Sequence, residues 1–288
     1  METKTKREVK NIGIVLSGGF SRGAIQLPFA KKIVEKIGYE RLKVLSGSSI
    51  GAINCYSLSC GTYEKMEKFF SKLDFDSTAT LKRAAKSGLF SKAFNQVEGE
   101  LKVPTYITST RLLPFDTYYF CLNNMPREDL INTINLSMTF PFVNGPKKYK
   151  GRYFMDGGST DNVPTYPLTY FDLDMIIIAH CYPKYYPPVE LLLEDKIVID
   201  VDVTLDLEKT ITSFSFTKKD FNLMVEMGNK NGQEFADYIF SDFDFDNVRE
   251  RCYSYISSQI EKRNKKSGDG LMTLVDFANA LYSFKGES

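Results

Sequence analysis

Two glycine-rich turns, each lying between a short apolar segment and an amphipathic one, constrain the fold of this chain more than any other feature. Residues 11–16 (NIGIVL) predict a buried strand, and three glycines occur in the seven residues that follow. Residues 22–37 then place apolar side chains at every fourth position, which is typical of a helix. The same order of strand, turn and helix recurs over residues 43–61. This alternation predicts a parallel sheet with crossover helices, that is, an α/β fold.

The rest of the chain predicts further strands and helices, with no Pro-, Gly- or Ser-rich linker between them. Alternating polarity predicts strands, and apolar spacing of three to four residues predicts helices. The predicted strands are a pair within 104–123 and single strands at 148–155, 174–181 and 197–205, and the predicted helices are 62–73, 80–101 and one beginning at Pro126.

Charge and residue counts exclude several classes of function. The 37 Lys and Arg residues against 36 Asp and Glu residues give a net charge of +1, so no general positive field is present to hold a nucleic acid. His180 is the only histidine, which excludes sites with several histidine ligands. The five cysteines form no C-x-x-C pair and predict free thiols in a reducing compartment. We expect neither a metal site nor a cofactor.

The N-terminus and the apolar segments predict a cytoplasmic protein. Residues 1–8 are polar and lead directly into the first strand, without the apolar region of a signal peptide. The longest strongly apolar stretch, residues 175–179, is far too short to span a bilayer. Secretion by a route that needs no cleaved signal stays open.

The motif Gly47-x-Ser49-x-Gly51 lies where a predicted strand turns into a helix. A serine in such a turn projects from a tight bend, and its flanking residues must be small to avoid clashes. The start of the following helix offers N–H groups and a partial positive charge to a developing oxyanion. Glycine and serine also occur in ordinary strand-to-helix turns, so the position in the chain carries much of this argument. The motif predicts Ser49 as a nucleophile.

The first glycine-rich turn, residues 17–23, has backbone amides that can face an anion. It is not a phosphate-binding P-loop, because Ala24 and Ile25 stand where that loop requires Lys and Ser or Thr. A dinucleotide-binding turn needs glycine at Phe20, so nucleotide binding is a distant alternative. An oxyanion hole needs only small residues and N–H groups, and neighbouring parallel strands would bring this turn beside Ser49. A glycine turn required by packing alone is the structural alternative.

Two residues are candidates for the base that a nucleophilic Ser49 requires. His180 would give the chain order Ser, Asp, His of α/β-hydrolases, but only one clear strand precedes Ser49, and a histidine ending a buried strand is more often structural. Asp156 precedes Gly157 and Gly158 at a predicted strand end. A carboxylate shielded from water gains proton affinity and can act as the base if it contacts the serine. An Asp-Gly turn without catalytic role is the common alternative.

Taken together, the motifs resemble those of the patatin-like phospholipase family. They are Gly18-Gly19-Phe20-Ser21-Arg22-Gly23, Gly47-Ser48-Ser49-Ile50-Gly51 and Asp156-Gly157-Gly158, supported by Ser137-x-x-x-Pro141 and Asp161-Asn162-x-Pro164. The resemblance covers about residues 11–181. It implies a three-layer α/β/α sandwich around a mainly parallel sheet, and calcium-independent hydrolysis of lipid acyl esters by a Ser-Asp dyad.

Carried over residue by residue, the resemblance implies Ser49 as the nucleophile and Asp156 as the proton acceptor. The supporting glycines are Gly47 and Gly51 beside the nucleophile and Gly157 and Gly158 beside the base, and the oxyanion loop comprises Gly18, Gly19, Phe20, Arg22 and Gly23. Many family members have a third glycine where this chain has Phe20. Phenylalanine supplies an N–H but does not easily adopt a positive φ, so we expect a reshaped hole or a narrowed pocket.

We therefore predict a serine hydrolase that cleaves fatty-acyl esters of phospholipids or lysophospholipids. The expected organisation is a polar tail at residues 1–10, a catalytic core at 11–181, and a strand and helical elaboration of the same domain at 182–288. A non-catalytic lipid-binding relative and an α/β-hydrolase-type esterase that uses His180 are the alternatives.

A basic stretch suggests one contact with membranes. Lys82, Arg83 and Lys86 lie near apolar side chains in a predicted amphipathic helix, which is compatible with transient contact with an anionic membrane surface. Most such helices are simply exposed faces. The sequence leaves the oligomeric state open.

Overall fold

The computed structural model describes residues 6–75, 98–139, 145–182, 185–192 and 195–267. The basic stretch at Lys82, Arg83 and Lys86 lies outside the described residues, as does most of the helix predicted over 80–101. Residues 98–101 are not helical, so that prediction is wrong at its C-terminal end.

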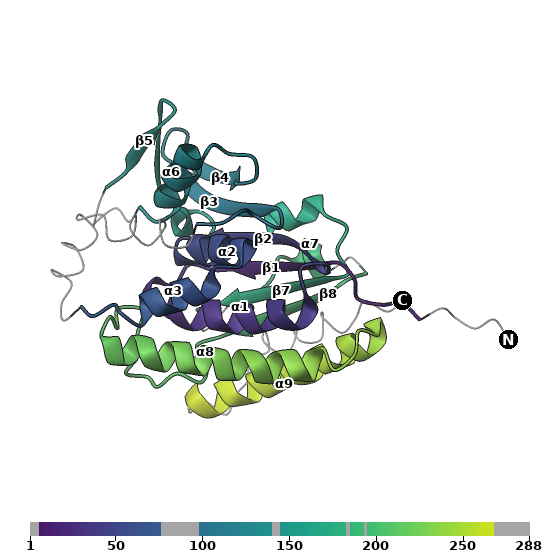
Figure 1. The fold of residues 1–288 in the computed structure, drawn as a ribbon. Coiled ribbons are helices and arrows are strands. Elements are labelled where there is room, and N and C mark those ends of the chain that lie inside the picture. Colours follow the sequence, from purple (N-terminus) through teal and green to yellow (C-terminus); the bar gives the residue numbers. More distant parts are fainter. Residues whose placement is uncertain (1–5, 76–97, 140–144, 183–184, 193–194, 268–288) are drawn as a thin grey trace.

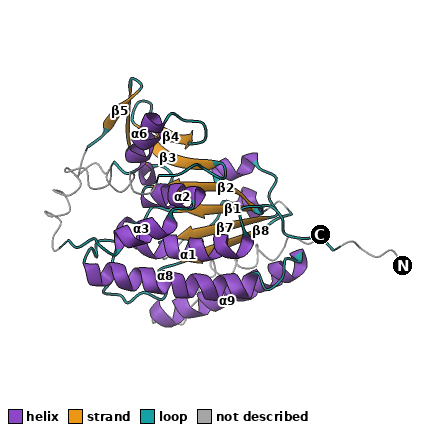
Figure 2. Cartoon of the chain, in the orientation of Figure 1, coloured by secondary structure: helices purple, strands orange, loops and turns teal. Residues whose placement is uncertain are grey.

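A mixed sheet of eight strands among the described residues forms the centre of the molecule (Figures 1 and 2). Its strands are β1 (Ile12–Leu16), β2 (Leu42–Ser48), β3 (Thr105–Arg111), β4 (Asp116–Cys121), β5 (Lys147–Tyr149), β6 (Arg152–Asp156), β7 (Met175–His180) and β8 (Ile197–Asp202). The order is β5-β6-β3-β2-β1-β7-β8, and β4 pairs with β3. Neighbours from β3 through β8 in this order are parallel, whereas β4 and β6 are antiparallel to β3. The predicted α/β fold with a parallel centre is confirmed.

Residues 147–156 form a hairpin and not the single strand that the sequence predicts. β5 and β6 pair antiparallel through a tight turn at Lys150 and Gly151. Both turn residues have positive φ, 44° and 81°, as in a type I′ turn. Asn-Gly or Asp-Gly is the usual sequence of this turn. Because a lysine stands in the first position here, the sequence did not predict the hairpin.

The helices cover the two faces of the sheet unequally. They are α1 (Gly23–Ile37), α2 (Ile50–Cys60), α3 (Tyr63–Phe70), α6 (Arg127–Ser137), α7 (Val189–Leu192), α8 (Lys218–Ile239) and α9 (Phe245–Ser267), with short 3-10 helices η1 (Phe20–Arg22), η2 (Gly157–Ser159) and η3 (Tyr166–Tyr170). One face lies against α1 and α2; α8 packs along α1, and α9 contacts α8 and the edge strand β8 (Figure 1). The other face has a thinner cover formed by η3, α7 and neighbouring loops.

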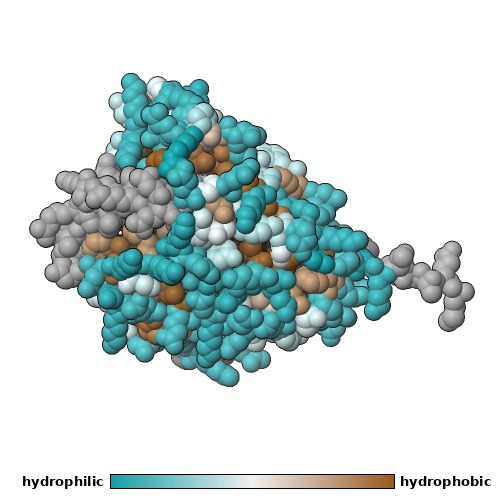
Figure 3. All heavy atoms as spheres, in the orientation of Figure 1, coloured by the Kyte–Doolittle hydropathy of each residue, from teal (hydrophilic) through white to brown (hydrophobic). Residues whose placement is uncertain are grey.

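The core explains why the central strands are almost wholly apolar. Every residue of β1 and β7 is buried, because side chains alternate between the two faces and both faces are covered. Ile14 of β1 belongs to the larger core on the α1 side, and the adjacent Val15 belongs to the smaller core beneath η3. Hydrophilic side chains dominate the visible outer surface over α8 and α9 (Figure 3).

Two glycines allow α8 to pack closely along α1. A Cβ at Gly228 would lie 2.3 Å from the carbonyl oxygen of Ile25, and one at Gly232 would lie 2.7 Å from the Cα of Phe29. Any larger side chain would therefore push the two helices apart. None of the described helices combines the length and the apolar composition that a membrane span requires.

The chain connections diverge at the carboxyl edge of the sheet. The connection after β1 runs through α1 on one face, whereas the connection after β7 runs through α7 on the opposite face. Since β1 and β7 are neighbours, the connections leave this pair in opposite directions. In open α/β sheets, ligands bind at such a switch point, outside the carboxyl ends of the strands.

Candidate active site

Ser49 occupies the tight turn between β2 and α2. Its backbone has φ 53° and ψ −124°, an unusual conformation for a residue with a side chain. The turn tolerates only small neighbours: a Cβ at Gly47 would lie 2.4 Å from the carbonyl oxygen of Gly51, and one at Gly51 would lie 2.2 Å from that of Leu16. This is the geometry of a sharp strand–serine–helix turn, which leaves the serine hydroxyl accessible.

The position of Asp156 follows from the way two strands share one edge of β3. β4 occupies one edge of β3 along residues 106–111. The other edge pairs first with β2, up to Thr108 opposite Ser48, and then with β6, starting at Ser109 opposite Asp156. β2 runs parallel to β3 and β6 runs antiparallel to it, so their C-terminal ends meet. Ser49, which follows β2, and Asp156, the last residue of β6, are therefore brought close together.

The hydroxyl of Ser49 donates a hydrogen bond from Oγ to Oδ2 of Asp156 at 2.6 Å. The second carboxylate oxygen, Oδ1, accepts the N–H of Gly158 at 2.8 Å. Only 8% of the surface of Asp156 is exposed, and this burial raises the pKa of its carboxyl, while the two hydrogen bonds partly oppose the shift. A carboxylate made more basic and placed in contact with a hydroxyl is suited to accept its proton.

Buried backbone contacts fix both members of this pair. Ser137, at the end of α6, accepts the N–H of Ser49 on its Oγ at 3.0 Å. The N–H of Asp156 donates to the carbonyl oxygen of Thr139 at 2.8 Å, and its own carbonyl accepts the hydroxyl of Thr110 at 2.9 Å. The neighbouring Gly157 lies so close to β3 that a Cβ there would be 2.3 Å from the Thr108 carbonyl oxygen. Hydrogen bonds and close packing of the backbone therefore hold both Ser49 and Asp156 in position.

The first glycine-rich turn lies beside Ser49, as the sequence predicts, but its amides are not equivalent. A Cβ at Gly18 would be 3.0 Å from the Cβ of Ser49, which shows how close the turn comes. The N–H of Gly18, which the sequence predicts as an oxyanion donor, donates to the carbonyl oxygen of Asn162 at 3.1 Å in this structure. The N–H of Gly19 has no hydrogen-bond partner among the described residues.

Phe20 adopts a φ of 52°, a conformation that phenylalanine does not easily take. Its backbone takes the left-handed conformation that a glycine would adopt at lower cost. Its ring is exposed and contacts the exposed ring of Phe214, with centroids 5.1 Å apart. The next residue, Ser21, donates both its N–H and its Oγ–H to the carbonyl oxygen of Ser213. The turn is thus attached to residues 211–214.

Arg22 and Gly23 hold the turn in place. The guanidinium of Arg22 donates to the carbonyl oxygens of Cys181 at 3.4 Å and Ile211 at 3.3 Å. Gly23 is required by packing, since a Cβ there would lie 2.1 Å from Cγ1 of Ile50 at the start of α2. Both residues therefore contact the supporting structure around the turn.

His180 is fully buried at the end of β7. Its Nδ1 accepts the N–H of Tyr182 at 3.3 Å, and its Nε2 lies 3.6 Å from Oδ2 of Asp200. The ring of Tyr185 packs against it, with centroids 5.2 Å apart. The histidine thus packs among Tyr182, Tyr185 and Asp200, as a structural residue would. The hydroxyl of Ser49 instead donates to Asp156.

Asn162 is a site residue that the sequence-based assignment did not include. Its Oδ1 occupies the space between the two glycine turns, where a Cβ at Gly18 or Gly158 would come within 2.3 Å or 2.5 Å of it. Its Nδ2 donates to the carbonyl oxygen of Gly18 at 3.5 Å and to the hydroxyl of Tyr182. The signal that could have identified it is the Asp-Asn-x-Pro motif that follows the base.

Two buried amide side chains that were not predicted from the sequence, Gln26 and Asn54, support the first glycine-rich turn. Gln26 donates from Nε2 to the carbonyl oxygens of Ser17 at 3.1 Å and Ala179 at 2.9 Å, which joins the ends of β1 and β7. Asn54 of α2 donates to Oε1 of Gln26 and to the carbonyl oxygen of Gly23. Both side chains are fully buried, so these bonds satisfy amide donors that would otherwise be costly, whereas Oδ1 of Asn54 has no hydrogen-bond partner among the described residues.

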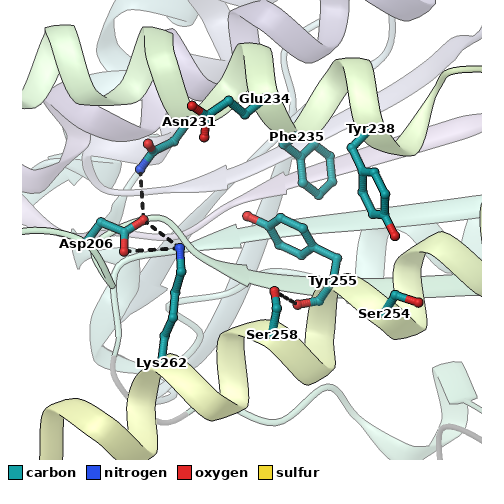
Figure 4. Close-up of a pocket in the computed structure, with 9 residues that line it drawn as sticks. All are labelled: Asp206, Asn231, Glu234, Phe235, Tyr238, Ser254, Tyr255, Ser258 and Lys262. Carbon is teal, nitrogen blue, oxygen red and sulfur yellow. Dashed lines mark hydrogen bonds and ion pairs between the residues drawn. The ribbon is translucent and has the colours of Figure 1, made fainter.

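A separate hollow of about 310 Å³ lies between α8 and α9 (Figure 4). Phe235 and Tyr255 face each other in it, and Lys262 pairs with Asp206 at one end. None of its lining residues belongs to the turns that carry Ser49 and Asp156. In the described part of the chain, no group of three His, Cys, Asp or Glu side chains is arranged to hold a metal ion.

Curated proteins with similar sequences include two from viruses. The chain is 26% identical to "Probable lipid hydrolase 463L" of Invertebrate iridescent virus 6 over 182 residues, which is 52% of this chain and 61% of that protein. It is also 26% identical to an uncharacterized protein of Acanthamoeba polyphaga mimivirus over 197 residues, 59% of this chain and 64% of that protein. The match thus spans less than two thirds of each relative.

Solved structures that match include VipD from Legionella pneumophila, with a TM-score of 0.44 and 13% identity over 98% of this chain and 83% of that one. Human GIVD cytosolic phospholipase A2 matches with a TM-score of 0.43 and 11% identity over 89% of this chain and 60% of that one. The family model described as "Patatin-like phospholipase" matches residues 14–169, more than half of the 288 residues. This chain belongs to the patatin-like phospholipase family.

Proposed function

We propose that this chain is a lipid acyl hydrolase that cleaves fatty-acyl esters of phospholipids or lysophospholipids, with Ser49 as nucleophile and Asp156 as base. The observation that carries the proposal is the 2.6 Å hydrogen bond from Ser49 Oγ to the buried carboxylate of Asp156. Membership of the family and the similarity to a protein named as a probable lipid hydrolase support the substrate class.

In the acylation step, Ser49 Oγ attacks the carbonyl carbon of the ester while its proton passes to Oδ2 of Asp156. Negative charge develops on the carbonyl oxygen, and the N–H of Gly19 is the donor in the first turn that we assign to it. The tetrahedral intermediate collapses when the ester C–O bond breaks. The departing alcohol takes the proton back from Asp156, which leaves an acyl group on Ser49.

In the deacylation step, water attacks the acyl carbonyl and gives its proton to Asp156. The second tetrahedral intermediate collapses to release the fatty acid, and the proton returns to Ser49 Oγ. Asp156 is therefore needed as a carboxylate at the start of each step and as an acid at its end. Its burial supports both roles, because it raises the affinity of the carboxylate for the proton.

The scheme assigns no step to a metal ion, and we propose that hydrolysis is independent of calcium. Addition of EDTA should leave the rate of ester cleavage unchanged. A rate that falls with EDTA and returns on addition of Ca²⁺ would contradict this part of the proposal.

The organisation of the chain forms part of the same proposal. We assign the catalytic core to residues 11–181 and regard residues 182–288 as an elaboration of the same domain. The bonds of Ser21 to Ser213 and of Arg22 to Ile211 support this, since they join the first turn to the C-terminal third.

Release of fatty acid from phosphatidylcholine and lysophosphatidylcholine tests the function. Ser49→Ala and Asp156→Asn should each lower turnover by about 10⁴-fold, as expected when one member of a catalytic unit is lost. His180→Gln is the matched control and should retain turnover. Turnover that survives Ser49→Ala, or that His180→Gln abolishes in a folded protein, would contradict the assignment.

A further inference from the structure

We propose that the tips of the β3–β4 and β5–β6 hairpins form a docking surface for an anionic phospholipid bilayer. The inference rests on the proposed function, because a hydrolase of phospholipids must reach substrates that are held in a bilayer. Two large apolar side chains lie at the β3–β4 tip, and both are open to solvent: Leu113 is 83% exposed and Phe115 is 64% exposed. Exposed apolar side chains that lie together mark a site of interaction with a protein or a membrane.

The hairpin that pairs with β3 beside this apolar tip carries exposed cations. Lys147, Lys148 and Arg152 are exposed on β5 and β6. Neither Lys147 nor Lys148 forms an ion pair with any described residue. The two hairpins, residues 105–121 and 147–156, carry five Lys or Arg residues against two Asp residues, which is a local excess of positive charge. Such an excess attracts an anionic surface.

The two hairpins form one unit, so the apolar and cationic groups are presented together. The N–H of Leu112 donates to the carbonyl oxygen of Tyr153 at 2.9 Å, which joins the β3–β4 turn to β6. The ammonium of Lys148 lies 5.8 Å from the ring centroid of Tyr153, which is itself exposed. We call Leu113, Phe115, Lys147 and Lys148 the hairpin patch.

The hairpin patch lies on the same extension of the sheet as the dyad. β6 leads from Arg152 directly to Asp156, and β3 continues from Ser109, opposite Asp156, toward Leu113. Four residues of extended strand span about 13 Å. Figure 1 shows β4 and β5 at the end of the molecule away from α8 and α9. A bilayer bound here would lie near Ser49, with the C-terminal helices facing the solvent.

The chemistry of the hairpin patch favours a bilayer over an acidic protein. A protruding apolar tip flanked by cations can insert its apolar side chains among the acyl chains while the cations remain among anionic head groups. An acidic protein would pair with the cations, but it would need a separate pocket for a protruding Leu-Pro-Phe tip.

Co-sedimentation of the full chain with vesicles tests the proposal, and the Ser49→Ala background prevents lipid consumption. Vesicles contain phosphatidylcholine alone or a two-to-one mixture of phosphatidylcholine and phosphatidylserine. Lys147→Gln with Lys148→Gln should weaken binding to the mixed vesicles by about 25-fold, which is about fivefold for each cation. Leu113→Ser with Phe115→Ser should weaken it by at least about tenfold.

Matched controls lie on α8. Lys219→Gln with Lys230→Gln removes two exposed lysines from the opposite side of the molecule and should leave vesicle binding unchanged. Equal weakening by both lysine pairs would overturn the docking site, as would full binding by the hairpin variants or an absence of binding to mixed vesicles. Equal binding to phosphatidylcholine alone would overturn the role of the cations.

A fluorophosphonate adduct on Ser49 reports the proposed function separately, in the wild-type background. Failure of that function removes the adduct and leaves vesicle binding as measured. Failure of the docking site leaves the adduct intact in all hairpin variants. The two proposals are therefore distinguishable.

Discussion

The hydroxyl of Ser49 donates to the carboxylate of Asp156 across 107 residues of sequence. The contact depends on β3, one edge of which pairs with the end of β2 through Thr108 and with the end of β6 through Ser109. Adjacent residue pairs of one sheet therefore set the distance between the two side chains. A flexible loop would hold this distance less firmly. Catalytic groups need this kind of rigid support.

The pH dependence of hydrolysis should report the environment of Asp156. Burial raises the pKa of its carboxyl above the ordinary 3.8, and the reaction needs the carboxylate form. kcat/KM should therefore fall as the pH drops through this raised pKa, so the acid limb of the profile lies above 3.8. His180→Gln is the control and should leave the limb in place. Loss of the limb in that variant would assign it to the histidine.

The same carboxyl should make stability depend on pH in the opposite sense to an ion-paired aspartate. Its pKa is higher in the folded protein than in the unfolded chain, so the folded state binds the proton more tightly. The group thus stabilises the fold at low pH, and this contribution is lost as the pH rises through the folded pKa.

Asp156→Asn removes this titration. The free energy of unfolding of the variant should exceed that of wild type most at about pH 8, and the difference should shrink toward about pH 4. Urea unfolding at the two pH values measures it. A difference that grows as the pH falls would show that the aspartate is stabilised as an anion.

Phe20 should show the cost of a side chain at positive φ. Phe20→Gly and Phe20→Ala both remove the contact with the ring of Phe214, but only glycine relieves the left-handed backbone at φ 52°. The glycine variant should be more stable than the alanine variant by about 1 kcal/mol. Thermal or urea unfolding of the pair measures this difference. Equal stabilities would mean that the turn relaxes when the ring is lost.

Asn162 should act by positioning the two glycine turns. Asn162→Ala empties the space that its Oδ1 occupies between Gly18 and Gly158, so both turns gain freedom beside the reacting groups. We expect kcat/KM to fall by about 10- to 100-fold, the effect of a small misplacement of catalytic groups. Tyr182→Phe removes only one partner of the amide and should have a smaller effect. Unchanged kinetics in Asn162→Ala would remove this residue from the site.

The local structure around the site could be predicted because each element has its own sequence signal. The apolar run of β1, the periodicity of α1 and the Gly-x-Ser-x-Gly turn are local patterns. The order of the three glycine-containing motifs was also enough to predict the family. The turn at Lys150 and Gly151 was missed because its lysine is atypical of a type I′ turn.

The contacts between distant segments could not be predicted in the same way. No local pattern states that β6 continues the edge of β3 where β2 ends, although this brings Asp156 to Ser49. The bond from the N–H of Gly18 to the carbonyl of Asn162 likewise depends on how two loops pack. For Phe20, the sequence indicates only that phenylalanine disfavours a positive φ. The surrounding tertiary contacts override that preference.

The most direct test of the Ser49–Asp156 assignment is the intact mass of the protein after treatment with a fluorophosphonate, which reacts with an activated serine whatever the natural substrate. The account predicts a single adduct on the wild-type protein and no adduct on Ser49→Ala. Folded wild-type protein that forms no adduct, or a Ser49→Ala variant that forms it to the same extent, would contradict the assignment of Ser49 as the nucleophile.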